Sequence, residues 1–279
     1  MIHTSGWHLK EMALTHFPSA YLLVSHGSRD PRPQVEMARL AEMVAQQLSQ
    51  NDLMKAGGQL PTASIVEAAV LELASPLHQQ IQQFAERAVT LGCQHLYIVP
   101  IFLLPGVHVV EDIPAEVAIA EQKLEGKIAL EICPYLGSHP HLQEFWLDFA
   151  SGFGIPEQGR VLLGHGSRRV GGNQAMEAIA AQLGALPAYW SVAPSLPDQI
   201  HLLVGQSCTQ IDILPYFLFE GGITDAIAQS VQELAQQLPN VDLRWTPPRG
   251  ATVKLASFVV EAIAKSNEAF NTVRESART

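Results

Sequence analysis

The amino-acid sequence alternates short apolar runs with amphipathic segments, and the whole alternation occurs twice along the chain. In the first half, the strand-like runs at 64–73 and 95–103 are separated by a segment whose apolar residues recur every three or four positions, which is typical of a helix. Parallel strands need long crossover connections, and these are usually helical. The sequence therefore predicts an α/β fold in which helices flank a mostly parallel sheet.

Each half also begins with the same tripeptide at the end of its first strand-like run. His26 closes the run in YLLVSHGSRD at 21–30, and His165 closes the run in VLLGHGSRR at 161–169. In both places Gly-Ser and a basic residue follow the histidine. A lone His-Gly-Ser carries little information, but two copies in the same local context indicate an internal duplication.

A second pair of similar segments supports the duplication. IVPIFLLPG at 98–106 resembles ILPYFLFEG at 213–221. The two His-Gly-Ser copies are offset by 139 residues (165 − 26), and this second pair of segments is offset by 115 residues (213 − 98). Repeat units of this length are too long for solenoid repeats, which run about 20–50 residues. We therefore predict two similar domains, each a parallel sheet flanked by helices, at 20–145 and 146–279, after a leader at 1–19.

Composition argues against nucleic-acid and membrane partners. The formal net charge of the 279-residue chain is −10, so no broad basic face is expected to hold a phosphate backbone. The leader mixes His, Lys and Glu among its apolar residues, unlike a signal peptide. The most apolar stretch, at 96–110, is interrupted by Pro100 and Pro105 and is too short to span a bilayer as a helix.

The three cysteines, Cys93, Cys133 and Cys208, are widely spaced and form no Cys-x-x-Cys pair. An odd number of dispersed cysteines fits a protein of the reducing cytosol and excludes a cysteine-based zinc site. We therefore expect a cytoplasmic protein.

Three polar residues follow three neighbouring predicted strands: His26, Glu72 and His108. In parallel α/β sheets, ligands bind outside the carboxyl ends of the strands. Two imidazoles and one carboxylate suit a borderline divalent metal such as Fe²⁺, Co²⁺, Ni²⁺ or Zn²⁺, and they can also accept protons near neutral pH. The residues alone leave metal handling and base catalysis both open.

The His-Gly-Ser loop can also be interpreted in other ways. Gly27 and Ser28 lie at a predicted helix start, where backbone N–H groups attract anions. A histidine phosphatase would be expected to carry Arg directly before His-Gly, and Ser25 and Gly164 occupy those positions. A nucleophile elbow needs Gly-x-Ser-x-Gly, and GHGSR lacks the second glycine.

His139 and His141 in GSHPHL at 137–142 form another group of potential ligands. They flank a proline just before a predicted joining region. This pattern favours a surface turn over a metal site.

Taken together, the motifs resemble the class II tetrapyrrole chelatases, specifically the sirohydrochlorin cobaltochelatases and ferrochelatases. The resemblance rests on HGSR at 26–29, VLELASP at 70–76 and VPIFLLPGVHVVEDIP at 99–114, in this order. It covers residues 20 to about 145. The combination is specific, although His-Gly-Ser alone is not.

The resemblance implies that His26 and His108 are catalytic and metal-binding histidines and that Glu72 completes the site. It implies no tightly bound cofactor, because the divalent metal, Co²⁺ or Fe²⁺, is a substrate together with sirohydrochlorin. The substrate would carry many carboxylates. The local candidates for contacting them are Ser28, Arg29 and Arg32.

The second copy departs from this pattern. At the matched offsets His165 is retained, but Ala193 is expected at the position of Glu72 and Ile223 at that of His108. We therefore expect only the first domain to be active, with His165 and Arg168 holding substrate carboxylates. Short members of the family are single domains that pair, so the long chain is expected to be a monomeric fused pair.

The leading hypothesis is insertion of Co²⁺ or Fe²⁺ into sirohydrochlorin, in cobalamin or siroheme biosynthesis. Two pyrrolic protons must leave while the ion sheds water, which neutral imidazoles and a carboxylate can assist. The first alternative is a metal or tetrapyrrole carrier that does not catalyse insertion. The second is an unrelated α/β enzyme that uses the His-Gly-Ser loops on a phosphorylated small molecule. Nothing in the sequence selects cobalt over iron or nickel.

Overall fold

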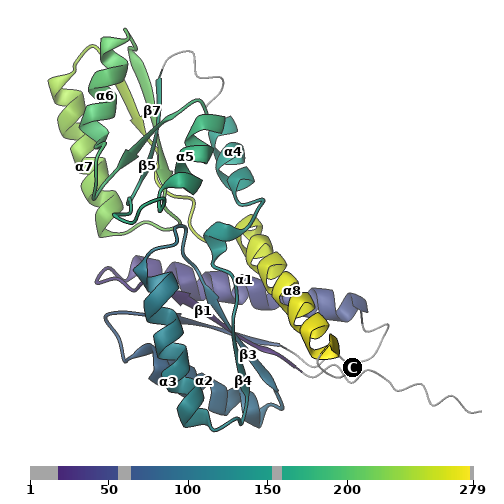
Figure 1. Cartoon of the computed structure of the whole chain (residues 1–279). Coiled ribbons are helices and arrows are strands. Elements are labelled where there is room, and N and C mark those ends of the chain that lie inside the picture. Colours follow the sequence, from purple (N-terminus) through teal and green to yellow (C-terminus); the bar gives the residue numbers. More distant parts are fainter. Residues whose placement is uncertain (1–17, 56–63, 153–158, 277–279) are drawn as a thin grey trace, which may run out of the picture.

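The computed structural model describes residues 18–55, 64–152 and 159–276, and residues 1–17 of the expected leader lie outside this range. Two four-stranded parallel sheets are present in the described part, with strand orders β2-β1-β3-β4 and β6-β5-β7-β8. Helices flank both sheets (Figure 1). The predicted α/β fold with two similar parallel sheets is therefore confirmed. We call the part built on the first sheet the first lobe and the part built on the second sheet the second lobe.

The elements of the first half follow the predicted alternation. The strands are β1 (Ala20–Ser25), β2 (Ile65–Val70), β3 (His95–Pro100) and β4 (Ala129–Ile132). The helices are α1 (Arg32–Lys55), α2 (Leu77–Thr90) and α3 (Ile113–Leu124). A π-helical segment at His108–Asp112 precedes α3, and a 3₁₀ helix at Leu136–Ser138 follows β4.

The second half repeats this order. Its strands are β5 (Gly159–Gly164), β6 (Leu186–Tyr189), β7 (Gln210–Tyr216) and β8 (Asp242–Trp245). Its helices are α5 (Gln174–Gln182), α6 (Leu196–Gly205), α7 (Gly222–Gln237) and α8 (Val253–Ser276). Along the chain, α4 (Gln143–Ser151) lies between β4 and β5. The sequence analysis assigned no element to this region, which joins the two halves.

Strand register supports the duplication. Val24 of β1 pairs with Pro100 of β3, and Leu163 of β5 pairs with Pro215 of β7. Each sheet therefore repeats the same alignment of its central strand with the next. Leu163 follows Val24, and Pro215 follows Pro100, by the same offsets that relate the two pairs of similar sequence segments.

Alternation along β1 explains why the first sheet is covered on both faces. Leu22 and Val24 belong to a core formed with α2 and α3, whereas Tyr21 and Leu23 belong to a second core that includes residues of α1. Successive side chains of a strand point to opposite faces, so one buried strand serves two cores. The strand is therefore apolar throughout.

Helix α4 packs on the second lobe, and helix α8 packs on the first. Trp146 of α4 lies 4.4 Å, ring centroid to centroid, from Tyr216 at the end of β7. In return, α8 runs beside α1 of the first lobe (Figure 1), where the Gln47 side chain donates a hydrogen bond to the backbone oxygen of Val253. Most of α4 thus lies beyond residue 145 and packs on the second lobe, whereas α8, from the end of the chain, packs on the first lobe.

Residues of α4 and α8 contribute to one core shared by both lobes. The core includes Leu23 of β1, Trp146 of α4, Leu162 of β5 and Leu255 of α8, all fully or almost fully buried. The outer faces of the two sheets have separate cores, with α2 and α3 on the first and α6 and α7 on the second. The two lobes are therefore packed together through their inner layers.

The histidines of the GSHPHL segment do not both lie on the surface, which corrects the expected surface turn. The His139 side chain is only 2% exposed, and its Nε2 lies 3.3 Å from Glu261 Oε2 of α8. Its ring also contacts that of Phe258. The segment is covered because α8 returns to the first lobe, which the local sequence does not reveal. His141, by contrast, is exposed.

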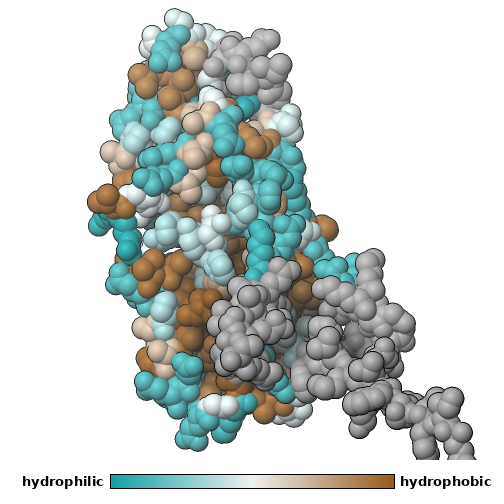
Figure 2. Space-filling view, turned by 45° about the vertical axis from the view of Figure 1, so that its right-hand side comes forward, coloured by the Kyte–Doolittle hydropathy of each residue, from teal (hydrophilic) through white to brown (hydrophobic). Residues whose placement is uncertain are grey.

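Within the described part of the chain, no helix has the length and apolar character needed to cross a bilayer. Figure 2 shows hydrophilic and hydrophobic residues mixed over one face of the molecule. The three cysteines form no disulfide. Burial raises the pKa of the Cys133 thiol to about 11.

Candidate metal-binding and catalytic site

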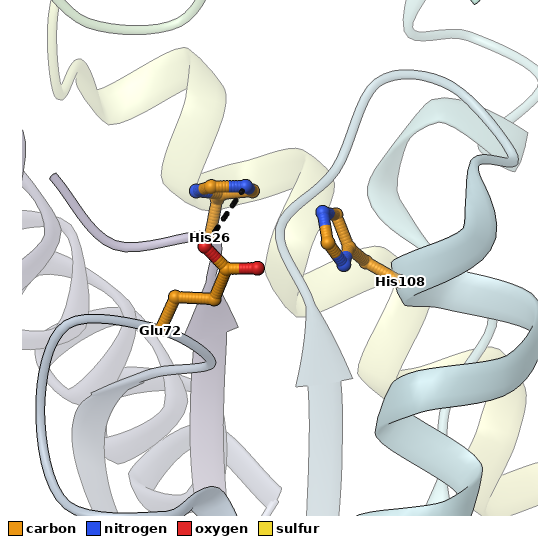
Figure 3. Close-up of side chains that lie close together, drawn as sticks. All are labelled: His26, Glu72 and His108. Atoms are coloured by element: carbon orange, nitrogen blue, oxygen red, sulfur yellow. Dashed lines mark ion pairs between the residues drawn. The ribbon is translucent and has the colours of Figure 1, made fainter. Parts of the chain in front are cut away.

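His26 lies directly after β1, at the carboxyl end of the first sheet. Its Nδ1 is 3.0 Å from the backbone oxygen of Gly27. A carbonyl oxygen only accepts hydrogen bonds, so Nδ1 carries the hydrogen in this arrangement. The lone pair of the neutral ring is therefore on Nε2, which faces Glu72 at 3.8 Å (Figure 3).

Gly27 allows the loop after β1 to approach the chain after β2. Its φ is +100°, and a Cβ at this position would lie 2.3 Å from the backbone oxygen of Glu72. The backbone N–H of Glu72 donates to the backbone oxygen of His26 over 2.9 Å. The glycine of the His-Gly-Ser loop thus holds the backbones of two candidate site residues together.

His108 enters from a third element, the π-helical segment that precedes α3. The backbone N–H of Ile113 donates to the backbone oxygen of His108, the five-residue spacing of a π-helix. The sequence analysis did not predict this π-helical segment. Pro114 has no N–H to donate to residue 110, so a regular α-helical bond is absent there.

The structure brings His26, Glu72 and His108 together. One potential ligand atom from each lies within 4.8 Å of those of the other two. The two imidazole rings are 4.7 Å apart between centroids and meet edge to face at 75°. Figure 3 shows the three side chains converging from the ends of β1 and β2 and from the segment after β3.

The site is open to water. About half of the His26 and Glu72 side chains and about a third of His108 are exposed. Ligands about 2.1 Å from a tetrahedral Zn²⁺-like ion would be about 3.4 Å apart, so these atoms need only a small side-chain movement to share one ion. The three residues could thus share one divalent metal ion and leave coordination positions open to solvent.

Ser28 and Arg29 follow in the same loop. The Ser28 hydroxyl accepts a hydrogen bond from the backbone N–H of Asp30 over 3.1 Å. Arg29 is exposed and forms no hydrogen bond or ion pair with the described residues. Of these two predicted substrate contacts, the guanidinium is available to an anion and the hydroxyl already has a local partner.

The Arg32 guanidinium forms ion pairs with carboxylates of the protein itself. It pairs with Asp30 of its own loop at 2.5 Å. It also pairs with Asp225 of α7, and its Nη1 lies 3.7 Å from Glu220 Oε2. The neighbouring Arg32 guanidinium lowers the pKa of Asp30. Arg32 therefore bridges the two lobes, so a substrate carboxylate would have to compete with these partners.

The second lobe repeats the His-Gly-Ser loop without the other two candidate ligands. His165 Nδ1 lies 3.1 Å from the backbone oxygen of Gly166, as in the first lobe. The backbone N–H of Ser191 donates to the backbone oxygen of His165 over 2.9 Å, the bond that Glu72 makes to His26. Ser191, and not Ala193, is therefore the counterpart of Glu72, because β6 ends earlier than the sequence offset assumed.

One arginine that follows His165 contacts the first lobe, and another is exposed. Arg168 is exposed and has no partner among the described residues. Arg169 Nη1 lies 3.4 Å from Glu111 Oε1, in the π-helical segment that carries His108. Ile223, at the His108 offset, lies at the start of α7 and is partly exposed.

Asp112 is the residue near the site that the sequence analysis missed. Its Oδ2 lies 2.7 Å from His108 Nδ1. The available signal was the His-x-x-x-Asp spacing in HVVED, because residues four apart are neighbours on one side of a helix.

Comparison with known proteins agrees with this fold and these motifs. The CbiX family model matches residues 20–151 and 159–266. A sirohydrochlorin ferrochelatase of Priestia megaterium is 27% identical over 239 residues, covering 82% of this chain and 84% of that protein. A sirohydrochlorin cobaltochelatase of the same organism is 24% identical over 260 residues, covering 88% and 79%.

A solved structure shows the same fold. SirB from Bacillus subtilis with Fe³⁺ has a TM-score of 0.66 at 24% sequence identity, and the match covers 89% of this chain and 95% of that one. The family match extends over both sheets. The chain thus belongs to the CbiX family, in a long form in which the family match extends over both lobes.

Proposed function

We propose that this chain inserts a divalent metal, Co²⁺ or Fe²⁺, into sirohydrochlorin. The observation that carries the proposal is the convergence of His26, Glu72 and His108 at an exposed site. The relatives named above as a ferrochelatase and a cobaltochelatase support the reaction and both metals. Insertion of Co²⁺ would place the reaction in cobalamin biosynthesis, and insertion of Fe²⁺ would place it in siroheme biosynthesis.

The chemistry requires groups that hold a metal ion without trapping it. Imidazole and carboxylate ligands suit Co²⁺ and Fe²⁺. The exposed positions of His26 and Glu72 leave room for the ion to pass to the ring nitrogens of the tetrapyrrole. As the metal enters, two pyrrolic N–H protons must leave, and neutral imidazole nitrogens or the Glu72 carboxylate can accept them.

The carboxylates of sirohydrochlorin need cationic partners, although the net charge of the chain is −10. Arg29 and Arg168 are exposed and unpaired with any described residue, one in each His-Gly-Ser loop. We propose these two as the main carboxylate contacts. Ser28, Arg32 and His165 are proposed as additional contacts, with Arg32 exchanging its protein partners for substrate.

The test is the initial rate of the absorbance change when the purified protein is mixed with metal-free sirohydrochlorin and Co²⁺ or Fe²⁺ under anaerobic conditions. We expect a rate well above that in buffer, with saturation in both substrates. A metal or tetrapyrrole carrier would bind its ligand without accelerating insertion. Rates no higher than in buffer with Co²⁺, Fe²⁺ and Ni²⁺ would therefore reject the enzyme and favour the carrier.

A further inference from the structure

The His108 imidazole contacts the carboxylate of Asp112 through its Nδ1. Asp112 Oδ2 lies 2.7 Å from His108 Nδ1, which is the shortest contact made by any of the three site residues in the described part of the chain. The ring projects from the π-helical segment toward His26 and Glu72 (Figure 3). Since Nδ1 faces Asp112, Nε2 is the nitrogen left for a metal ion.

This contact determines which nitrogen carries the hydrogen. An ionised carboxylate accepts hydrogen bonds and cannot donate them, so neutral His108 places its hydrogen on Nδ1. The lone pair is then on Nε2. Hydrogen bonds to the second nitrogen commonly fix the tautomer and ring orientation of metal-binding histidines.

We propose that Asp112 is a positioning residue that keeps His108 in the Nδ1–H tautomer and presents its Nε2 lone pair to the metal. The proposal rests on the proposed function insofar as the metal is a substrate. His26 achieves the same tautomer with the backbone oxygen of Gly27. Both histidines would thus offer Nε2, but only His108 depends on a replaceable side chain.

In the second lobe, both members of the His108–Asp112 pair are replaced. At the offset of 115 residues that relates β3 to β7, Ile223 stands for His108 and Ile227 for Asp112. Ile227 is fully buried in the core beneath α7. In the second lobe, where Ile223 replaces the histidine, the residue at the Asp112 offset therefore packs in the core and accepts no hydrogen bond from an imidazole. In the first lobe it is 44% exposed beside the site.

The experiment compares the wild-type protein with Asp112→Asn and Asp112→Ala at about pH 8, where a free imidazole is neutral. Glu121→Gln on α3 is the matched control, because it removes one exposed carboxylate from the same helix. NMR of histidine-¹⁵N-labelled protein distinguishes the two tautomers, and His108→Gln identifies the His108 resonances. Titration with Co²⁺ alone, followed by visible absorption, gives the metal affinity.

We expect His108 to be the Nδ1–H tautomer in the wild type and in Glu121→Gln. Asp112→Ala should shift His108 toward Nε2–H, the form that an unpaired imidazole favours in water, and should bind Co²⁺ about 10- to 100-fold more weakly. Asp112→Asn should shift less, because its amide oxygen can still accept a hydrogen bond from Nδ1–H. In the insertion assay, the KM for metal should rise more than kcat falls. Asp112 lies at the start of α3, where a carboxylate also favours the helix dipole, so the variants can lose stability as well.

Loss of stability alone would not move the tautomer, which separates positioning from a purely structural role. An unchanged tautomer in both Asp112 variants would overturn the proposal, and so would unchanged Co²⁺ affinity after a tautomer shift. Both readouts work without tetrapyrrole. A protein that fails to insert metal would therefore refute the proposed function while still deciding the role of Asp112.

Discussion

Trp146 of α4 donates its indole Nε1–H to the backbone oxygen of Pro215 in β7 over 2.9 Å, although 69 residues separate them. This bond ties the helix that follows the first sheet to the centre of the second. In exchange, α8 packs beside α1, and Lys254 of α8 forms an ion pair with Asp148 of α4. Helices α4 and α8 thus join the lobes through buried contacts and an ion pair at the surface.

Replacing Trp146 with Phe should destabilise the protein by about 1–3 kcal/mol, because it leaves a buried carbonyl oxygen without its donor. Trp146 is only 1% exposed, so water cannot readily take the place of the indole. Urea unfolding followed by circular dichroism measures the change. Trp190→Phe is the control: Trp190 is 44% exposed, and we expect a change within about 0.5 kcal/mol. Equal losses in the two variants would contradict the role assigned to the Trp146 bond.

Substitution of the two His-Gly-Ser histidines should affect metal insertion unequally. His26→Ala and His108→Ala should each lower the initial rate at saturating metal by about 10²-fold or more, on the order expected for losing a general base. His165→Ala should cost far less, because Ser191 and Ile223 supply neither a second imidazole nor a carboxylate to its lobe. A loss in His165→Ala as large as that in His26→Ala would show that both lobes contribute to the chemistry.

The two loop glycines provide a matched pair. Gly27 and Gly166 both have positive φ, +100° and +84°, so alanine at either should cost more than about 1 kcal/mol of stability. Only the Gly27 variant would push against the backbone of Glu72, whereas at Gly166 a Cβ meets the side chains of Val192 and Tyr189.

We therefore expect Gly27→Ala to lower the insertion rate on the order of 10²-fold through displacement of Glu72. Gly166→Ala should retain most of the rate at a temperature where both variants are folded. Rate measurements after thermal unfolding curves test this. If both variants insert metal at similar rates, the close approach at Gly27 does not position Glu72.

Stability should depend on pH through His139. Burial lowers the pKa of this imidazole, and the positive charge of Lys265 adds to the effect, while Glu261 opposes it. The other charged neighbours are His141, which lowers the pKa, and Glu144, which raises it. The folded state therefore favours the neutral ring more than the unfolded chain does.

The sign of the dependence follows from proton binding. Below about pH 6.5, the reference pKa of histidine, the unfolded chain binds a proton at this residue more readily than the folded protein. The contribution of His139 to the free energy of unfolding is thus fully present above this pH and is lost as pH falls toward the lowered folded pKa. Urea unfolding of wild type and His139→Gln between about pH 8 and 5 measures the difference. A difference that stayed constant or grew as pH fell would refute this assignment.

Several features were predictable because they depend on local patterns. Apolar periodicity separated the strands from the helices, since each element buries one face or stripe of its own residues. The placement of His26, Glu72 and His108 after three strands predicted their convergence, because parallel strands end at one edge of a sheet. The roles of these residues in metal binding and catalysis remain predictions.

Other features depended on how the backbone was locally arranged. The counterpart of Glu72 was assigned to Ala193 by sequence offset, but the bond from Ser191 to His165 shows that β6 ends earlier. The π-helical turn that brings Asp112 to His108 was also missed, because α- and π-helical hydrogen bonding share nearly the same side-chain pattern over five residues.

The sequence by itself determined the order of elements, the duplication and the candidate ligands, since these follow from residue type and spacing along the chain. Only the tertiary structure decided that α4 packs on the second sheet and α8 on the first, and that His139 is buried beneath α8. An amphipathic helix records that it has an apolar face but not which apolar surface covers it. Two similar sheets offer two such surfaces, so the choice depends on contacts between residues far apart in the chain.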